Sequence, residues 1–181
     1  TVSIDSNPDD PTNSQTAAFT FTVADEYSLS GAQCKIDTGD FASCTNSASY
    51  SNVAEGARTF TVRATDTAGN SADVTHSWYV DLTDPTISID SSPDAETNSQ
   101  SATFTMTVAD TYDNSPSKVC SLDSSSVNCA DTQSNLAEGS HTFSISATDD
   151  AGNSASASYT WLIDITDPTV SFASTPDAET N

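Results

Sequence analysis

The chain repeats itself at intervals of about 84 residues, and this period limits its possible folds more than any other feature. The segment TVSIDSNPD at Thr1 returns as TISIDSSPD at Thr86 and as TVSFASTPD at Thr169. The offsets are 85 and 83 residues, and the match of Trp78 with Trp161 keeps the second offset. A unit of this length is too long for a solenoid and is typical of small domains joined in series.

Two short seams divide the chain at this period. Residues 81–85 read DLTDP and residues 164–168 read DITDP, and neither seam contains the glycine or serine of a flexible linker. Proline also restricts the residue before it to an extended conformation, so we expect taut linkers. The sequence predicts one domain over residues 1–83, a second over residues 84–166, and the first strand and following loop of a third over residues 167–181.

Within each repeat, apolar residues alternate with hydroxylated ones. Phe19, Phe21 and Val23 alternate with threonines, and similar alternations begin at Phe104 and Phe143. A period of two is typical of antiparallel strands that bury one face. Turn-forming residues separate about seven such strands in a repeat. In the first repeat we expect them near residues 2–5, 16–25, 32–37, 41–45, 48–53, 58–66 and 72–81. This pattern predicts an all-β fold of tandem immunoglobulin-like or fibronectin-III-type β-sandwiches.

Each repeat carries two cysteines at nearly the same spacing. Nine residues separate Cys34 from Cys44, and eight separate Cys120 from Cys129, with turn-forming residues between them. A zinc site would need two more soft ligands per repeat, and the two histidines lie at positions that are not equivalent. The spacing therefore favours two hairpin disulfides, Cys34–Cys44 and Cys120–Cys129, over metal ligation or free thiols. Disulfides in turn indicate an extracellular or other oxidising compartment.

The charge balance excludes several functions. The chain has 26 Asp and Glu against 4 Lys and Arg, a net charge of −22. Such a surface repels phosphate backbones, so we expect no nucleic-acid partner. The apolar runs are too short for membrane insertion. We also expect no enzyme, because the paired carboxylates recur in both repeats or lie in turns, and no catalytic triad or phosphate-binding loop can be assembled.

Acidic residues concentrate around the seam at residues 81–85. In a sandwich, the loops at the end of the first repeat and at the start of the second meet there. Calcium takes six to eight oxygen ligands, and clustered carboxylates repel one another without a cation. We therefore predict a calcium site with candidate ligands Glu55, Asp81, Asp84, Asp110, Asp149, Asp150 and Asn153. The alternative is that these acids only cap turns and keep the protein soluble.

Three segments together resemble the bacterial Ig-like repeats of large surface adhesins. They are CSLD at residues 120–123 with the following Cys129, LAEGSHTF at residues 136–143, and ATDDAGN at residues 147–153. The first repeat departs from this pattern by an arginine, Arg58, in place of the histidine. The resemblance implies a structural extender of a bacterial cell-surface or secreted stalk, often stiffened by calcium at domain junctions. Its expected partners are neighbouring Ig-like repeats of the same chain or filament.

Two other functions remain open at this point. The repeats themselves can act as an adhesion module that binds a glycan or a host protein, which a cluster of exposed aromatic residues in one repeat would favour. Alternatively, the trailing strand at residues 169–181 lacks a partner strand in its own chain. An unpaired strand can complete the sheet of another copy, and the product would be an extracellular filament joined by strand exchange.

Overall fold

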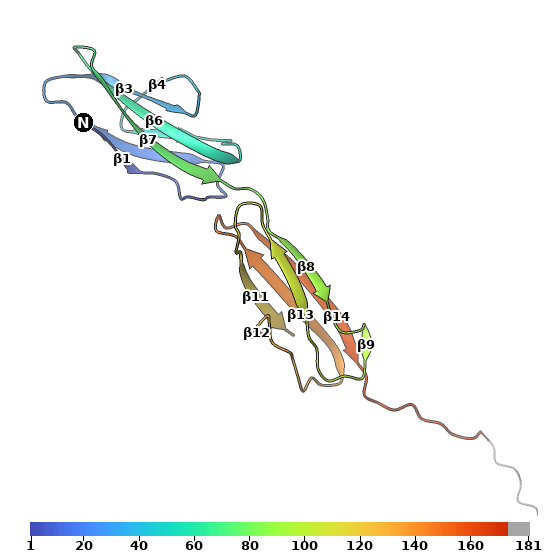
Figure 1. Ribbon diagram of the computed structural model, residues 1–181. Coiled ribbons are helices and arrows are strands. Elements are labelled where there is room, and N and C mark those ends of the chain that lie inside the picture. The colour runs from blue at the N-terminus through green and yellow to red at the C-terminus, as the bar shows by residue number, and fades with distance from the viewer. Residues whose placement is uncertain (174–181) are drawn as a thin grey trace, which may run out of the picture.

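A computed structural model describes residues 1–173 and shows two β-sandwiches in series (Figure 1). The first repeat contains β1 (Val2–Ser6), β2 (Ala17–Val23), β3 (Leu29–Ile36), β4 (Ala42–Cys44), β5 (Ser47–Tyr50), β6 (Gly56–Asp66) and β7 (Ser71–Val80). The second contains β8 (Thr86–Ser91), β9 (Glu96–Thr97), β10 (Thr105–Ala109), β11 (Ser117–Leu122), β12 (Ser125–Val127), β13 (Gly139–Thr148) and β14 (Ser154–Ile163). No helix in residues 1–173 is long and apolar enough to cross a membrane.

The first repeat folds as two facing sheets, with strand order β4-β3-β6-β7 in one and β1-β2-β5 in the other. The apolar side chains of the alternating strands meet between the sheets. Phe19 of β2 stacks on Phe60 of β6 with ring centroids 4.0 Å apart, and Trp78 of β7 lies edge-on to Phe19 at 5.2 Å. All seven expected strands are present close to their predicted positions, which confirms the sandwich fold.

The second repeat has the same design and its own core. Its sheets have strand orders β12-β11-β13-β14-β9 and β10-β8. Phe104 stacks on Phe143 with centroids 4.1 Å apart, and Trp161 lies edge-on to Phe104 at 5.5 Å. The buried residues of the two repeats form two separate clusters, so each sandwich has an independent set of core contacts.

The two repeats differ at one sheet edge. In the first, β5 pairs with β2 over residues 47–50. In the second, the corresponding segment makes only an isolated bridge between Gln133 and Ala102. Its sequence, residues 128–135, reads NCADTQSN and lacks the alternation of apolar residues that would bury one face of a strand.

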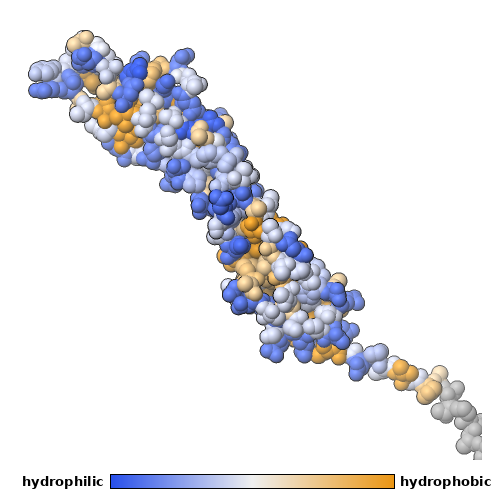
Figure 2. Space-filling view, viewed as in Figure 1, coloured by the Kyte–Doolittle hydropathy of each residue, from blue (hydrophilic) through white to orange (hydrophobic). Residues whose placement is uncertain are grey.

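In both repeats, the chain segment after the first strand runs parallel to the end of the last strand. Thr12 forms a parallel bridge with Val80, and its backbone N–H donates to the Tyr79 carbonyl at 3.0 Å. In the second repeat, β9 pairs in parallel with β14 through Glu96 and Leu162. The chain therefore enters each sandwich at one pole and leaves it at the opposite pole, and the two sandwiches form an elongated rod with a largely hydrophilic visible face (Figures 1 and 2).

Both predicted disulfides are present, Cys34–Cys44 and Cys120–Cys129, and each joins the strands of one hairpin or its flank. The expected first strand of a third repeat is not formed over residues 169–173, where no neighbouring strand within the described part of the chain pairs with it. The remainder of that predicted segment, residues 174–181, lies outside the described residues.

Candidate metal centre

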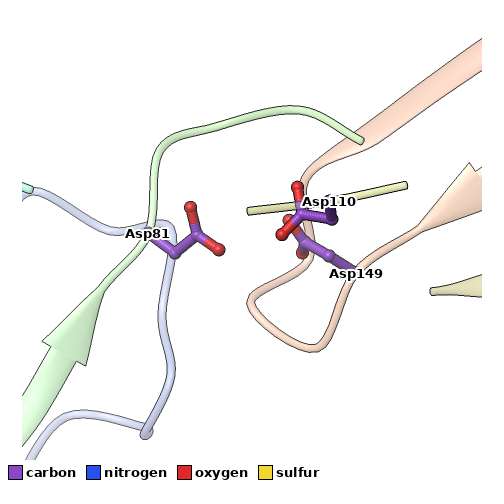
Figure 3. A group of neighbouring side chains, drawn as sticks. All are labelled: Asp81, Asp110 and Asp149. Atoms are coloured by element: carbon purple, nitrogen blue, oxygen red, sulfur yellow. The ribbon is translucent and has the colours of Figure 1, made fainter. Parts of the chain in front are cut away.

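Three aspartates from the two repeats meet at the seam. Asp81 follows β7 of the first repeat, while Asp110 and Asp149 follow β10 and β13 of the second. One carboxylate oxygen from each lies within 4.8 Å of the other two. The Asp81 carboxylate points across the seam toward the other two side chains (Figure 3). Asp81 and Asp149 are 1% and 6% exposed, so this is a buried acidic group.

The two aspartates of the second repeat are held by their own loops. The backbone N–H of Asn153 donates to Oδ1 of Asp149, and its side-chain Nδ2 donates to Oδ2, both at 2.8 Å. Gly152 makes this tight turn possible because its φ of 95° is unfavourable for residues with a Cβ. Oδ1 of Asp110 accepts hydrogen bonds from the N–H groups of Tyr112 at 2.8 Å and Asp113 at 2.9 Å.

One oxygen of the group lacks a partner. Oδ2 of Asp110 is shielded from solvent and accepts no hydrogen bond from the described residues. A buried polar atom of this kind is costly unless something satisfies it. A cation between the three carboxylates would satisfy it directly.

Burial and neighbouring charges shift the pKa values of two of these aspartates. Burial raises the pKa of Asp81, and the negative charges of Asp110, Asp149 and Glu55 raise it further, against a stabilising hydrogen bond from the Thr83 N–H. Burial also acts to raise the pKa of Asp110, but hydrogen bonds from backbone N–H groups outweigh it and the net pKa is lowered. Asp110 is therefore held as an anion. Its negative charge disfavours the anionic form of the neighbouring Asp81.

The candidate ligands from the sequence fall into three sets. Asp81, Asp110 and Asp149 form the central group, with Asn153 hydrogen-bonded to it. Glu55 lies at the seam, where Oε1 accepts a hydrogen bond of 3.0 Å from the Thr83 hydroxyl. Asp84 and Asp150 are exposed and do not belong to the central group.

The seam also contains direct contacts that the sequence did not indicate. The Asn13 N–H donates to the Ala151 carbonyl at 3.2 Å. The rings of Tyr79 and Tyr112 have centroids 4.8 Å apart, and Pro85 of the linker is buried. The Tyr79 hydroxyl, followed by Glu55, raises the pKa of Tyr112. One signal could have indicated Tyr79: the other repeat carries Leu162 at the equivalent position, so this tyrosine is not required by the sandwich.

Each aspartate of the acidic group has an equivalent at one of the outer poles of the two repeats. Asn70 holds Asp66 through its backbone N–H and Nδ2, both at 2.8 Å, as Asn153 holds Asp149. Asp25 accepts hydrogen bonds from two backbone N–H groups of its loop, as Asp110 does. At the opposite end of the chain, Asp164 occupies the place of Asp81. Among the described residues, however, a group of three convergent acids forms only where the two repeats meet.

Comparisons with known proteins agree with this architecture. Residues 44–132 match the family model of the bacterial Ig-like domain (group 3), a span of about one repeat that crosses the seam. Murine CEACAM1b is similar in fold, with a TM-score of 0.50 and 10% identity over 91% of this chain and 99% of that chain. The fibronectin(III)-like modules of Clostridium thermocellum CbhA give a TM-score of 0.49 and 17% identity over 90% of this chain and 94% of that chain.

No curated protein matches the sequence. The similarity to murine CEACAM1b concerns the fold alone, because the sequence identity is low. The family match concerns the sequence itself and includes the seam. It confirms the resemblance to bacterial Ig-like repeats that the sequence predicted. Over residues 44–132, the chain is similar to the bacterial Ig-like domain (group 3) family.

Proposed function

We propose that the two repeats are a structural extender in the stalk of a bacterial cell-surface or secreted adhesin-like protein, stiffened by calcium at the seam. Bacterial Ig-like sequence and two disulfides are consistent with an extracellular protein. Domains of this kind are typically non-enzymatic. The neighbouring Ig-like repeats of the same chain or filament are then its principal partners.

The acidic group at the seam is the observation that carries this proposal. It takes Asp81 from one repeat and Asp110 and Asp149 from the other, so an ion bound there joins the two sandwiches. Carboxylate oxygens are the ligands that calcium prefers, with carbonyl groups and waters completing a shell of six to eight oxygens. The unsatisfied, solvent-shielded Oδ2 of Asp110 adds an oxygen whose lone pairs are free for a cation.

Stiffening follows from the position of this group. Without a cation, the negative charges on opposite sides of the seam repel one another and oppose the direct contacts between the repeats. With a cation, the same charges become attractive ligands on both sides of a short linker. The ion is remote from the two cores, so its removal is expected to loosen the junction while each sandwich stays folded.

Small-angle scattering and calorimetry test this proposal together. We expect uptake of about one calcium ion at the seam, and a distribution of interatomic distances that broadens when a chelator is added. The variant Asp81→Asn with Asp149→Asn should bind no ion at the seam, and its distance distribution should be the same in calcium and in chelator.

The chain offers a matched control for this variant. Asp25→Asn with Asp66→Asn removes two carboxylates of the equivalent half-site at the outer pole of the first repeat, where the described residues form no group of three. This control should keep both calcium uptake at the seam and the narrow distribution. Identical scattering in calcium and chelator, with no calcium uptake, would leave the acids as turn caps and solubilising charges.

A second candidate is a filament subunit joined by strand exchange through residues 169–181. Val170 and Phe172 are 91% and 88% exposed, yet their equivalents Ile87 and Ile89 pack against a core. These side chains could complete the sheet of another copy. Val170→Asp with Phe172→Asp should then abolish concentration-dependent assembly measured by light scattering. A wild-type protein that stays monomeric at high concentration would contradict this candidate.

A further inference from the structure

A second feature of the seam is a pocket of about 300 Å³ beside the acidic group. The first repeat contributes Asp10 and Tyr79 to its walls, and the second contributes Tyr112, Asp113 and Asp150. Asp81 lies at the boundary between the pocket and the acidic group. The pocket therefore exists only when the two repeats are packed together as in the structure.

Most residues of this pocket do not recur in the other repeat, whereas all three of the acidic group do. The lining residues that recur are Asp81, Tyr112 and Ala151, which correspond to Asp164, Tyr27 and Ala68. Asp81, Asp110 and Asp149 correspond to the aspartates Asp164, Asp25 and Asp66. In the pocket, Asp10 corresponds to Ala95, Tyr79 to Leu162, Asp113 to Ser28 and Asp150 to Thr67. Residues that only support the sandwich are expected to recur in both repeats. Four non-recurring residues that line one pocket indicate a role specific to this seam.

The distribution of charge indicates the kind of ligand. Four aspartates line the pocket, and no lysine or arginine lines it. Outside the group of Asp81, Asp110 and Asp149, no three acidic or histidine side chains of the described residues converge within 4.8 Å. Asp10, Asp113 and Asp150 are thus too widely spread to share one metal ion. A larger, elongated cation can reach them.

Two further observations indicate which cation fits the pocket, namely an amine on an apolar chain. Oδ2 of Asp113 is shielded from solvent and accepts no hydrogen bond from the described residues, so it needs a donor. The rings of Tyr79 and Tyr112 form an aromatic wall on which methylene groups pack and ammonium groups bind by cation–π attraction. We propose that this pocket binds an alkylammonium group, supplied either by a free diamine or by a lysine side chain of a protein.

This inference goes beyond the role of a calcium-stiffened extender. Asp110 and Asp149 hold the metal centre but do not line the pocket, while Asp113 and Asp150 line the pocket but lie outside the group of three. The two sites can therefore be disabled separately. A chain that binds no calcium but binds an ammonium ligand would contradict the proposed function alone.

The test uses the whole chain in saturating calcium at constant ionic strength, observed by NMR. The probes are 1,5-diaminopentane, N-acetyl-lysine N-methylamide and the uncharged N-acetyl-norleucine N-methylamide. We expect one or both amines to shift the backbone amide signals of Tyr79, Tyr112 and Ala151, and the uncharged probe to leave them in place. Preference for the diamine or for the lysine amide identifies the source of the ammonium group.

The variant Asp113→Ser with Asp150→Thr tests the site with residues that the other repeat already uses at these positions. It should weaken amine binding about tenfold or more, since two charges that contact the ligand are lost, while calcium uptake stays unchanged. Tyr79→Leu should weaken binding as well. The control Asp40→Ala with Asp131→Ala removes two exposed charges from the hairpin regions and should bind amines like the wild type. Equal affinities in the variant and the control, or shifts spread over the whole acidic surface, would overturn the proposal.

Discussion

The side-chain amide of Asn153 donates a hydrogen bond of 3.0 Å to the backbone carbonyl of Asp81, across the seam between the repeats. The same Nδ2 donates to Oδ2 of Asp149 at 2.8 Å. One side chain therefore orients a carboxylate of the candidate metal centre and also ties the residue that follows β7 of the first repeat to the second repeat. Asn70 makes the equivalent bonds to Asp66, but it lies at the outer pole.

Replacement of Asn153 by alanine should loosen the junction. The hydrogen bond across the seam and the orientation of Asp149 are lost together, at a cost of about 1–3 kcal/mol of coupling between the repeats. NMR relaxation should show the two repeats tumbling more independently than in the wild type. Asn70→Ala removes the same kind of side-chain bond without crossing the seam, and it should leave the tumbling unchanged. Equal effects of the two substitutions would refute a specific role for Asn153.

A second pair of equivalent residues gives the repeats different responses to pH. Arg58 donates from Nε to the Ala54 carbonyl and from Nη1 to Asp37, both at 2.9 Å. His141 occupies the same place, with Nε2 2.9 Å from the Ala137 carbonyl and Nδ1 2.7 Å from Asp123. Both ring nitrogens face acceptors, so the imidazole donates both bonds only when it is protonated.

The second repeat should therefore lose stability as the pH rises through the pKa of His141. The Ala137 carbonyl and then Asp123 raise this pKa above its ordinary value of 6.5. The charged form is thus favoured in the folded state. Its contribution, about 1.5–3 kcal/mol for hydrogen bonds to a charged group, is complete below about pH 6.5 and lost above the folded pKa. Urea unfolding between pH 5 and 8 measures the effect. His141→Arg should remove this pH dependence from the second repeat, and Arg58→His should introduce it into the first.

Loss of a disulfide should destabilise only the repeat that contains it. The bonded cysteines are 10 and 9 positions apart, and loops of this length stabilise a fold by about 3 kcal/mol in the chain-entropy description. Cys34→Ser with Cys44→Ser should lower the free energy of unfolding of the first repeat by that amount and leave that of the second unchanged. Peptide mapping without reducing agent should recover only bridges within a repeat. A bridge between repeats would contradict the structure.

Core substitutions should also act on one repeat at a time. Phe60 is fully buried and stacks on Phe19, so Phe60→Ala should cost about 3–5 kcal/mol in the first repeat. Phe143 has the same role in the second. In an NMR spectrum of Phe60→Ala, we expect signals of residues 1–83 to weaken or collapse while those of residues 84–166 persist. Collapse of both sets would show that the boundaries predicted at the seam are wrong.

The sequence predicted the strands well because alternation and turn residues are local signals. The buried phenylalanines of β2 and β6 follow directly from the spacing of Phe19, Phe21 and Phe60. The incomplete edge of the second repeat was harder to predict, because Gln133 meets Ala102 through a register between distant segments. The hairpin disulfides were accessible because the two cysteines of each pair are close in the chain.

The seam was predictable in position but not in detail. Asp81, Asp110 and Asp149 lie at the facing poles of the two sandwiches, and their side chains meet as the topology predicts. Membership of a loop does not determine where each side chain points, however, and Asp84 and Asp150 lie outside the group. Contacts such as that of Tyr79 with Tyr112 depend on the rotation of one repeat against the other, about which the sequence carries no local signal.

The parallel pairing at the end of each sandwich determines how a pulling force would pass through the chain. Tension enters the first repeat through β1 and leaves through β7, so Thr12 and Val80 would be drawn in opposite directions along the strand axis. The hydrogen bonds that Thr12 makes with Tyr79 and Asp81 would then bear the load in shear and break together, whereas a hairpin unzips one bond at a time. The equivalent bonds of Ala95 and Thr97 would bear it in the second repeat. Each disulfide lies away from the strand pair that would carry this force, so mechanical resistance and covalent cross-linking would reside in different parts of the same small domain.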